Sequence, residues 1–201
     1  MSPLLEEEAP RDPLILFDRW FREAADAGAL QPDAMTLATA SDEGPSARMV
    51  LFKGLRNRDF LFYSNYDSRK GRDLSHDRRA ALVFFWAVTR HQVRVYGTVR
   101  KVGRKESEEY FHGRPRGAQL SAYASRQSHL VRSREQLERR VLEVATRYPD
   151  EVPLPKDWGG YALRPIWIEF WESREDRLHD RLRYVFRSEF TGAWRIERLA
   201  P

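Results

Sequence analysis

The residues best able to do chemistry in this 201-residue chain are clustered cations and phenols, starting with the segment NYDSRKGR at 65–72. Ser68 is a residue type that often begins a helix. Arg69 and Lys70 would then lie in the first turn, beside free backbone N–H groups and the positive end of the helix dipole. The pattern predicts an anion site. The alternative is a capped surface helix whose cations are solvated.

A second pair of cations, Arg48 and Lys53, lies at the two ends of the run RMVLFK. In a strand, this odd separation places the two side chains on opposite faces unless a bulge intervenes. The pair therefore need not serve one pocket. Because burying an unpaired ammonium is costly, a lysine that follows Val50, Leu51 and Phe52 indicates a functional role for Lys53.

Two further segments collect hydrogen-bond donors. Residues 109–116, EYFHGRPR, would end a helix with a phenol, an imidazole and two guanidiniums, a set that suits a phosphate monoester. Cations that merely offset a helix dipole are the alternative there. In WESREDRLHDR at 171–181, an extended backbone would point Arg177, His179 and Arg181 to one face, toward an anionic ligand. Simple surface alternation is the alternative in that segment.

Several kinds of site are missing from the sequence. There is no glycine-rich dinucleotide loop, no P-loop and no Gly-x-Ser-x-Gly elbow. The five histidines lack metal-ligand spacing, and the absence of cysteine excludes disulfides and thiolate sites. We therefore expect no metal, and chemistry that depends on an organic cofactor.

The overall charge favours an anionic partner. The net charge is +5, and 30 of the 35 basic residues are arginine, which binds phosphate and carboxylate in a bidentate way. Most aromatic residues lie in apolar runs such as LVFFWA and IWIEFW, which argues against a nucleic-acid-binding module. The acidic N-terminus, MSPLLEEEAPRDP, does not read as an export signal, and no apolar run approaches the ~18 residues of a membrane span. We expect a cytoplasmic protein with no membrane partner.

The elements that must position these residues follow from the hydrophobic pattern. Pro13 would open a helix that ends at Gly28, residues 104–112 look helical, and a capping box at Ser133 begins a longer helix. Short β-rich runs are expected at 35–41, 47–55, 59–65, 80–87, 92–101, 162–171, 181–187 and 193–199. This order predicts an α+β fold with a mostly antiparallel barrel or sandwich and flanking helices. Residues 1–11 are expected to form a flexible arm, and residues 12–201 one domain.

Taken together, the segments resemble the pyridoxamine/pyridoxine 5′-phosphate oxidase family from about residue 12 to residue 201. The resemblance rests on RMVLFK, FYSN, SRKGR, RHQVRVYG, YFHGRPRGAQLSA, SRQS, VPLPKDWGGY, IEFWE, RLHDRLRY and WRIERLAP. It implies an FMN-binding split β-barrel that forms a homodimer, with FMN in clefts at the subunit interface.

The same resemblance implies roles for individual residues. Residues expected to contact FMN are Arg48, Met49, Val50, Leu51, Lys53, Tyr63, Ser64, Arg69, Lys70, Gln92, Gln127, Ser128, Trp171 and Arg181, some of them supplied by the partner subunit. Lys53, Tyr110 and Arg114 match residues that hold the substrate phosphate. Arg177 and His179 match the catalytic residues over the substrate pyridine ring, where they orient it.

The implied reaction is oxidation of pyridoxamine 5′-phosphate or pyridoxine 5′-phosphate to pyridoxal 5′-phosphate by FMN, with dioxygen as acceptor and hydrogen peroxide as product. Three features depart from the family pattern: Ala118 replaces a common serine, Ser121 a common glycine, and the N-terminal segment is acidic rather than basic. Two other interpretations stay open. One is a flavin oxidase of the phenazine-biosynthesis type, which acts on a non-phosphorylated cyclic acid, and the other is a non-catalytic flavin or pyridoxal phosphate binding protein.

Overall fold

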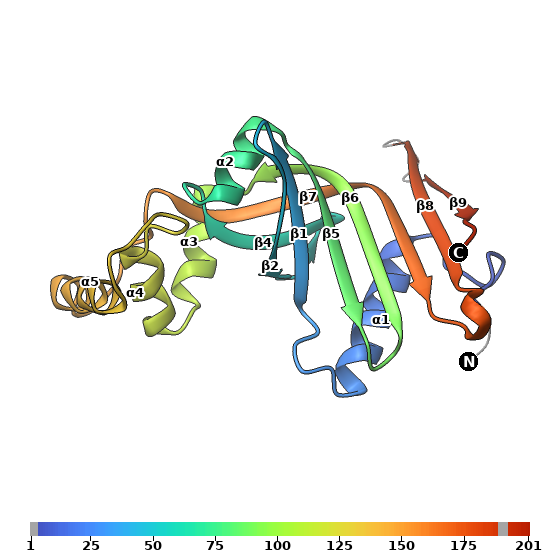
Figure 1. Ribbon diagram of the computed structural model, residues 1–201, viewed down its shortest axis with the longest axis horizontal. Coiled ribbons are helices and arrows are strands. Elements are labelled where there is room, and N and C mark those ends of the chain that lie inside the picture. The colour runs from blue at the N-terminus through green and yellow to red at the C-terminus, as the bar shows by residue number, and fades with distance from the viewer. Residues whose placement is uncertain (1–3, 189–192) are drawn as a thin grey trace.

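A strongly curved antiparallel sheet forms the body of the molecule (Figure 1). The computed structural model describes residues 4–188 and 193–201. Neighbouring strands follow the order β2-β1-β5-β6-β7-β4-β3, and β8 pairs with both β7 and β9. The strands are β1 (Ala34–Ser41), β2 (Gly44–Leu51), β3 (Leu55–Arg56), β4 (Asp59–Asn65), β5 (Arg79–Trp86), β6 (His91–Lys101), β7 (Trp158–Glu172), β8 (Asp180–Ser188) and β9 (Ala193–Arg198).

The turn after β2 brings the two edges of the sheet together. The backbone N–H of Lys53 donates to the carbonyl of Leu61 at 2.8 Å, and the N–H of Leu61 donates to the carbonyl of Gly54 at 3.0 Å. Gly54 has a φ of 102°, a conformation that a residue with a Cβ rarely adopts. The prediction of one strand over 47–55 is therefore wrong, because β2 ends at Leu51 and the chain turns at Gly54.

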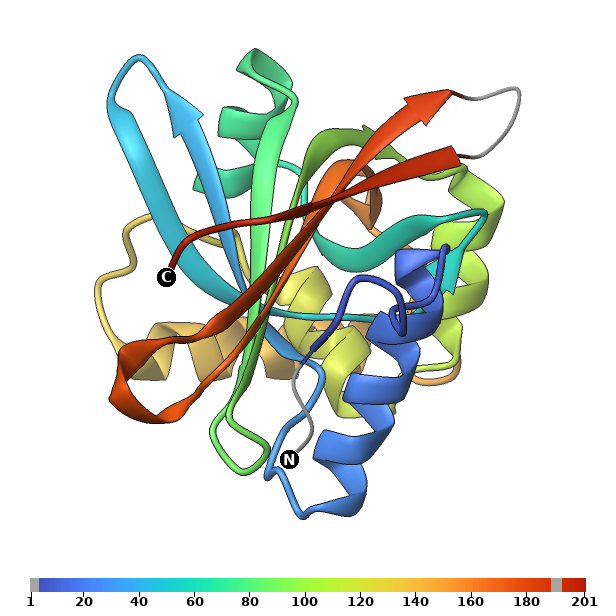
Figure 2. The same cartoon turned by 90° about the vertical axis from the view of Figure 1, so that its right-hand side faces the viewer.

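The long strand β7 connects the barrel to a projecting hairpin. Its first half pairs with β4, from Trp158 to Leu163, and its second half pairs with β8, from Trp167 to Glu172. The hairpin of β8 and β9 therefore lies far from β4 along the sheet. Figure 2 shows β8 and β9 crossing in front of the barrel.

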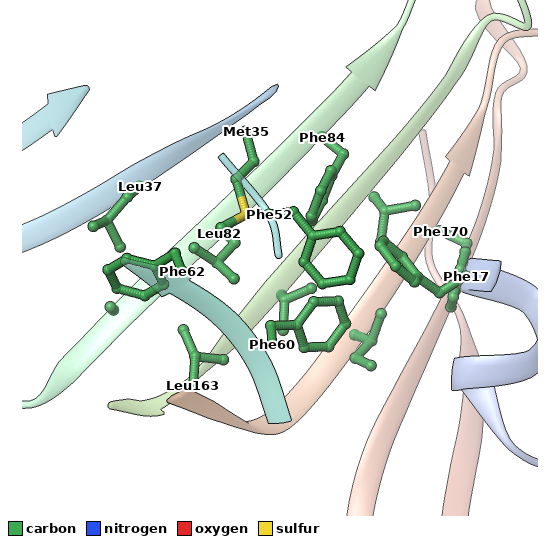
Figure 3. Close-up of a cluster of buried hydrophobic side chains, with 14 of the residues drawn as sticks. Phe17, Met35, Leu37, Phe52, Phe60, Phe62, Leu82, Phe84, Leu163 and Phe170 are labelled. Atoms are coloured by element: carbon green, nitrogen blue, oxygen red, sulfur yellow. The ribbon is translucent and has the colours of Figure 1, made fainter. Parts of the chain in front are cut away.

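Aromatic side chains fill the barrel, and helix α1 (Pro13–Asp26) closes one end of it (Figure 3). Phe17 of α1 makes edge-to-face contacts with Phe52, Phe60 and Phe84 at ring-centroid distances of 4.9–5.3 Å. This packing explains the helical spacing of the apolar residues before Gly28. The side chain of Asp12 accepts a hydrogen bond from the backbone N–H of Leu14 at 2.9 Å and begins the helix.

The remaining helices are α2 (Arg69–His76), α3 (Arg104–His112), α4 (Arg116–Ala124), α5 (Arg134–Arg147) and a short 3₁₀ turn, η1 (Glu175–Arg177). Helices α3, α4 and α5 gather at the end of the molecule opposite to the β8–β9 hairpin (Figure 1). The predicted α+β class with flanking helices is confirmed. Helix α4 was not predicted, and only Leu120 of its residues is buried.

The expectation that residues 1–11 form a flexible arm separate from the domain 12–201 stays a prediction. Residues 1–3 lie outside the described residues. Leu4 and Ala9 pack against the core, and the carbonyl of Pro10 accepts a hydrogen bond from the Tyr184 hydroxyl at 2.9 Å. No helix in the described ranges 4–188 and 193–201 is long and apolar enough to cross a membrane.

Candidate active site

A cavity of about 330 Å³ lies between the end of β2, strand β4 and the helices α2 and α3. Many of the residues predicted from the sequence line it together: Met49, Val50, Leu51, Lys53, Tyr63, Ser64, Lys70, Tyr110, Arg114 and Gln127. Pro115 and Trp158 complete its lining and were not assigned from the sequence. Trp158 lies in VPLPKDWGGY, one of the segments that carry the family resemblance, but no local pattern linked it to Tyr63.

An aromatic stack forms one wall of the cavity. The rings of Tyr63 and Tyr110 lie 3.7 Å apart with an angle of 10° between their planes, and Trp158 continues the stack at 5.8 Å from Tyr63. Burial, with a smaller contribution from Glu106, raises the pKa of Tyr63 to about 12. The phenol is therefore neutral at physiological pH and offers a hydrogen-bond donor beside a flat apolar surface.

Lys70 is the buried cation of the cavity, with only 7% of its surface exposed. Its Nζ donates to Gln127 Oε1 at 3.0 Å and to Ser68 Oγ at 3.2 Å, and the Ser64 hydroxyl donates to the same Gln127 oxygen at 3.2 Å. Burial, aided by the charge of Arg48, lowers the pKa of Lys70 to about 8. The alternative of a solvated surface cation therefore does not describe Lys70.

The other half of the predicted anion site faces a different hollow. Arg69 is exposed, lies 3.5 Å from Glu43, and lines this neighbouring hollow together with Ser128. Ser68 begins α2 as predicted, since its hydroxyl accepts the backbone N–H of Gly71. Arg69 and Lys70 therefore point to separate surroundings within one chain.

Arg48 and Lys53 also have different surroundings. Arg48 donates to the Leu37 carbonyl at 3.1 Å and to the Thr39 hydroxyl at 2.7 Å, and it lies 3.3 Å from the carboxylate of Asp73. Burial lowers the pKa of Arg48. Lys53 lines the cavity, and its Nζ lies 2.8 Å from the carboxylate of Asp33. Only Lys53 of the two faces the cavity.

Arg114 has a buried hydrogen-bond donor in its guanidinium group. Its Nη1 is buried and has no hydrogen-bond partner among the described residues. The guanidinium lies over the Trp158 ring, 4.9 Å from the centroid, and burial lowers the pKa of Arg114. A buried donor without a partner is uncommon in a folded protein and indicates a site for an acceptor that comes from outside the chain. An oxyanion such as a phosphate fits this place.

A second group of predicted residues lies outside the cavity: Gln92, Trp171, Arg177, His179 and Arg181. Gln92 pairs across the sheet with Trp171, which pairs in turn with Arg181. The rings of Trp171 and His179 lie 4.7 Å apart, and Arg177 is exposed at the tip of the turn. The structure brings these residues together at the turn end of the β7–β8 hairpin. This end lies away from α3 and α4 (Figure 1).

The prediction of an extended backbone over residues 171–181 is wrong. Glu175–Arg177 forms a 3₁₀ turn, with Asp176 and Arg177 in the left-handed region. The alternation of Arg177, His179 and Arg181 therefore does not follow a strand. Arg181 alone of the three lies in β8, and its guanidinium donates twice to Glu169 Oε1, at 2.8 and 3.0 Å.

The described part of the chain contains no group of three or more histidine, cysteine, aspartate or glutamate residues that could hold a metal ion.

Comparison with known proteins identifies the family of the chain. Residues 21–148 match the family model for pyridoxamine 5′-phosphate oxidase, and residues 158–201 match that for the C-terminal dimerisation region of pyridoxine 5′-phosphate oxidase. The chain belongs to the pyridoxamine 5′-phosphate oxidase family. The predicted oxidoreductase and its cofactor FMN are confirmed with the family, and the dimerisation region supports a homodimer.

Relatives in this family match the whole chain. A pyridoxine/pyridoxamine 5′-phosphate oxidase from Salinibacter ruber is 54% identical and covers 100% of this chain and 94% of its own length. The protein of the same name from Bordetella petrii is 49% identical with the same coverage. These similarities confirm the resemblance read from the sequence motifs.

Solved structures share the fold. PhzG from Burkholderia lata 383, in complex with tetrahydrophenazine-1-carboxylic acid, has a TM-score of 0.91 and 30% identity, covering 100% of this chain and 99% of its own. A pyridoxamine 5′-phosphate oxidase-related, FMN binding protein from Nostoc punctiforme has a TM-score of 0.73 and 17% identity, with full coverage of both chains. The predicted split-barrel fold is confirmed. The roles of the individual site residues stay predictions.

Proposed function

We propose that this chain oxidises pyridoxamine 5′-phosphate or pyridoxine 5′-phosphate to pyridoxal 5′-phosphate, with dioxygen as acceptor and hydrogen peroxide as product. The observation that carries the proposal is the buried Nη1 of Arg114, which has no hydrogen-bond partner in residues 4–188 and 193–201, in a cavity that Lys53 and Tyr110 also line. A phosphate monoester would accept hydrogen bonds from all three side chains. Charge-assisted bonds of this kind are about twice as strong as neutral ones.

The cavity residues fit FMN. Met49, 62% exposed, and Leu51, 38% exposed, offer an apolar surface on the cavity side of β2. Buried Lys70 supplies a cation whose Nζ lies within hydrogen-bond distance of two neutral groups, Gln127 Oε1 and Ser68 Oγ. When bound, FMN would supply the acceptor for a hydride, which carries both electrons of the oxidation, from the substrate.

The protein's own residues would bind the substrate and orient it. Lys53, Tyr110 and Arg114 would hold the phosphate, while the stacked rings of Tyr63, Tyr110 and Trp158 keep water from one side of the cavity. Arg177 and His179 would orient the pyridine ring. Because the turn between β7 and β8, which carries these two residues, lies at the end of the molecule opposite to α3 and α4, we infer that the partner subunit supplies them across the dimer interface.

The proposed reaction balances for both substrates. Pyridoxine 5′-phosphate loses two hydrogens from its exocyclic alcohol to give the aldehyde, and dioxygen takes up both to become hydrogen peroxide. Pyridoxamine 5′-phosphate loses two hydrogens to give an imine, and water hydrolyses the imine to the aldehyde and ammonia.

A second candidate is an oxidase acting on a non-phosphorylated cyclic acid. The likeness to PhzG over the full chain favours it, as does Ala118, which removes one hydroxyl donor from the region around Arg114. Lys53, Tyr110 and Arg114 in one cavity favour the phosphorylated substrate. A flavin-binding protein without turnover is the third hypothesis.

An aerobic assay of the FMN-loaded protein tests the proposal, with aldehyde and peroxide followed together. Pyridoxamine 5′-phosphate, pyridoxine 5′-phosphate and unphosphorylated pyridoxine serve as three separate substrates. We expect equal amounts of aldehyde and peroxide from the two phosphate esters and a much lower kcat/KM for unphosphorylated pyridoxine. An FMN-loaded protein that oxidises neither ester would overturn the proposal, and oxidation of tetrahydrophenazine-1-carboxylic acid by it would establish the second candidate.

A further inference from the structure

The turn between β7 and β8 is held at its base by one arginine. Arg174 Nε lies 2.7 Å from Asp180 Oδ2, and its Nη2 lies 3.1 Å from Glu172 Oε2. Glu172 and Asp180 are the last cross-strand pair of the two strands. Arg174 therefore ties together the two points at which the turn leaves the sheet.

The turn that Arg174 closes has an unfavourable backbone. Asp176 has a φ of 54° and Arg177 a φ of 61°, and neither is glycine. Two successive residues with side chains in the left-handed region persist only where surrounding contacts hold them. The ion pairs of Arg174 with Glu172 and Asp180 are contacts of this kind at the base of the turn.

The same arginine contacts His179 through its backbone. The N–H of Arg174 lies 3.1 Å from Nδ1 of His179. A backbone N–H can only donate, so Nδ1 must be the accepting nitrogen. In the neutral imidazole the proton then lies on Nε2, which becomes a hydrogen-bond donor.

Further contacts link this turn to the N-terminal segment. Asp180 Oδ1 lies 2.8 Å from Arg198 Nη1, and the backbone N–H of Leu4 donates to Asp180 Oδ2 at 3.3 Å. Arg198 also pairs with Glu6 at 2.7 Å. Arg174, Arg198 and the backbone of Leu4 thus hold Asp180, the residue directly after His179.

We propose that Arg174 is a positioning residue that holds His179 in the tautomer with its proton on Nε2, so that His179 donates a hydrogen bond to an oxygen of the substrate ring. The proposal rests on the proposed function for the identity of the substrate. The tautomer itself is a property of the free protein. Arg174 acts through His179 and the turn and does not touch the substrate.

The test compares Arg174→Ala and Arg174→Lys with Arg134→Ala, a control that removes an exposed arginine paired with Glu138 on α5. Imidazole ¹⁵N chemical shifts of the free protein report the tautomer, and the loss of signals in His179→Asn assigns them. Steady-state kinetics with pyridoxine 5′-phosphate supply KM and kcat separately.

We expect the wild type and Arg134→Ala to show an unprotonated Nδ1 and a protonated Nε2 at His179. Arg174→Ala should show a mixture of tautomers and a KM raised about tenfold, the size of one lost hydrogen bond to an uncharged group. Arg174→Lys, which keeps one ionic contact, should lie between the two. Flavin content should stay at the wild-type level in all of these variants.

A protonated Nδ1 at His179 in the wild type would overturn the proposal. So would an Arg174→Ala variant with the wild-type tautomer. The tautomer is measured without turnover, so a protein inert toward pyridoxine 5′-phosphate that shows the expected shifts would contradict the proposed function and leave the role of Arg174 standing.

Discussion

Buried Lys70 and half-buried Arg114 distinguish the cavity at the scale of single residues. Lys70 lies among Gln127, Ser68 and Ser64, and no carboxylate of the described residues lies within hydrogen-bond distance of its ammonium. Arg114 lies over Trp158 with one nitrogen unpartnered among the described residues. Burying charge without an opposite charge is costly, so a site of this kind is preorganised for an anion that completes it.

Removal of the Arg114 guanidinium tests the substrate-phosphate site. We expect Arg114→Ala to raise KM for pyridoxine 5′-phosphate by roughly 10- to 100-fold, because a hydrogen bond to a charged group contributes about 1.5–3 kcal/mol. FMN content should not change. Arg139→Ala, at an exposed position of α5, is the control. An unchanged KM in Arg114→Ala would remove this residue from the phosphate site.

The lowered pKa of Lys70 predicts that FMN binding depends on pH. The pKa of Lys70 in the folded protein is about 8, so the ammonium is present below pH 8 and is lost as pH rises through 8. If the ammonium holds the FMN phosphate, the Kd of FMN should rise about tenfold between pH 7 and pH 9. Flavin fluorescence titration measures this change. Riboflavin, which lacks the phosphate, and the Lys70→Met variant should show no such dependence.

The same pKa affects stability without FMN. The pKa of Lys70 is lower in the folded chain than in the unfolded one, so the unfolded chain binds more protons between pH 8 and the ordinary lysine value. The free energy of unfolding should therefore rise with pH in this window. The Lys70→Met variant should lack this rise in the free energy of unfolding. Urea unfolding of the wild type and of Lys70→Met at pH 7 and pH 9 measures the difference.

The partners of individual residues were the least predictable part of the site. Residue types and local patterns marked Lys53, Lys70 and Arg114 as candidates. The pairing of Lys53 with Asp33, and of Lys70 with Gln127, joins parts of the chain that only the barrel brings together. Local periodicity holds no information on such contacts.

At the scale of elements, α2 positions Lys70 by packing tightly against the preceding loop. A Cβ built on Gly71 would overlap the backbone carbonyl of Tyr66, and the Tyr66 ring in turn packs edge-on against Tyr161. The first turn of the helix can approach Tyr66 this closely only because residue 71 has no side chain.

We expect Gly71→Ala to destabilise the fold by about 1–3 kcal/mol, the usual cost of overpacking, and to weaken FMN binding. Gly117→Ala in α4 is the matched control, since its Cβ would meet no atom within 4 Å. That substitution should leave stability unchanged or raise it by up to about 1 kcal/mol, the gain of alanine over glycine in a helix. Urea unfolding of the two variants would decide; equal stabilities would contradict the packing described for α2.

Most elements followed from the hydrophobic pattern, and the exceptions have physical causes. The strand at 59–65 and the helix at 104–112 were predicted to the residue. Helix α4 follows Pro115 and buries only Leu120, so it lacks an apolar stripe that a sequence pattern could show. The turn at 175–177 depends on ion pairs of Arg174, which override the alternation of Arg177, His179 and Arg181.

At the scale of the whole molecule, the two groups of site residues lie on elements at opposite ends of the folded subunit (Figure 1). The cavity with Arg114 is at the end that carries α3 and α4, and the turn with Arg177 is at the end that carries β8. The C-terminal region that carries this turn matches a dimerisation region. Under the proposed function, a complete site would therefore form where the cavity of one subunit meets the turn of its partner.

Mixing two defective homodimers tests this account most directly. Arg114→Ala and Arg177→Ala, each with FMN bound, are dissociated, mixed in equal amounts and reassociated, and kcat/KM is measured with pyridoxine 5′-phosphate. Half of the reassociated dimers carry one variant of each kind, and in these one of the two sites is intact, so activity should recover to about a quarter of the wild-type value. Activity that stays at the mean of the two separate variants would contradict a site shared between subunits.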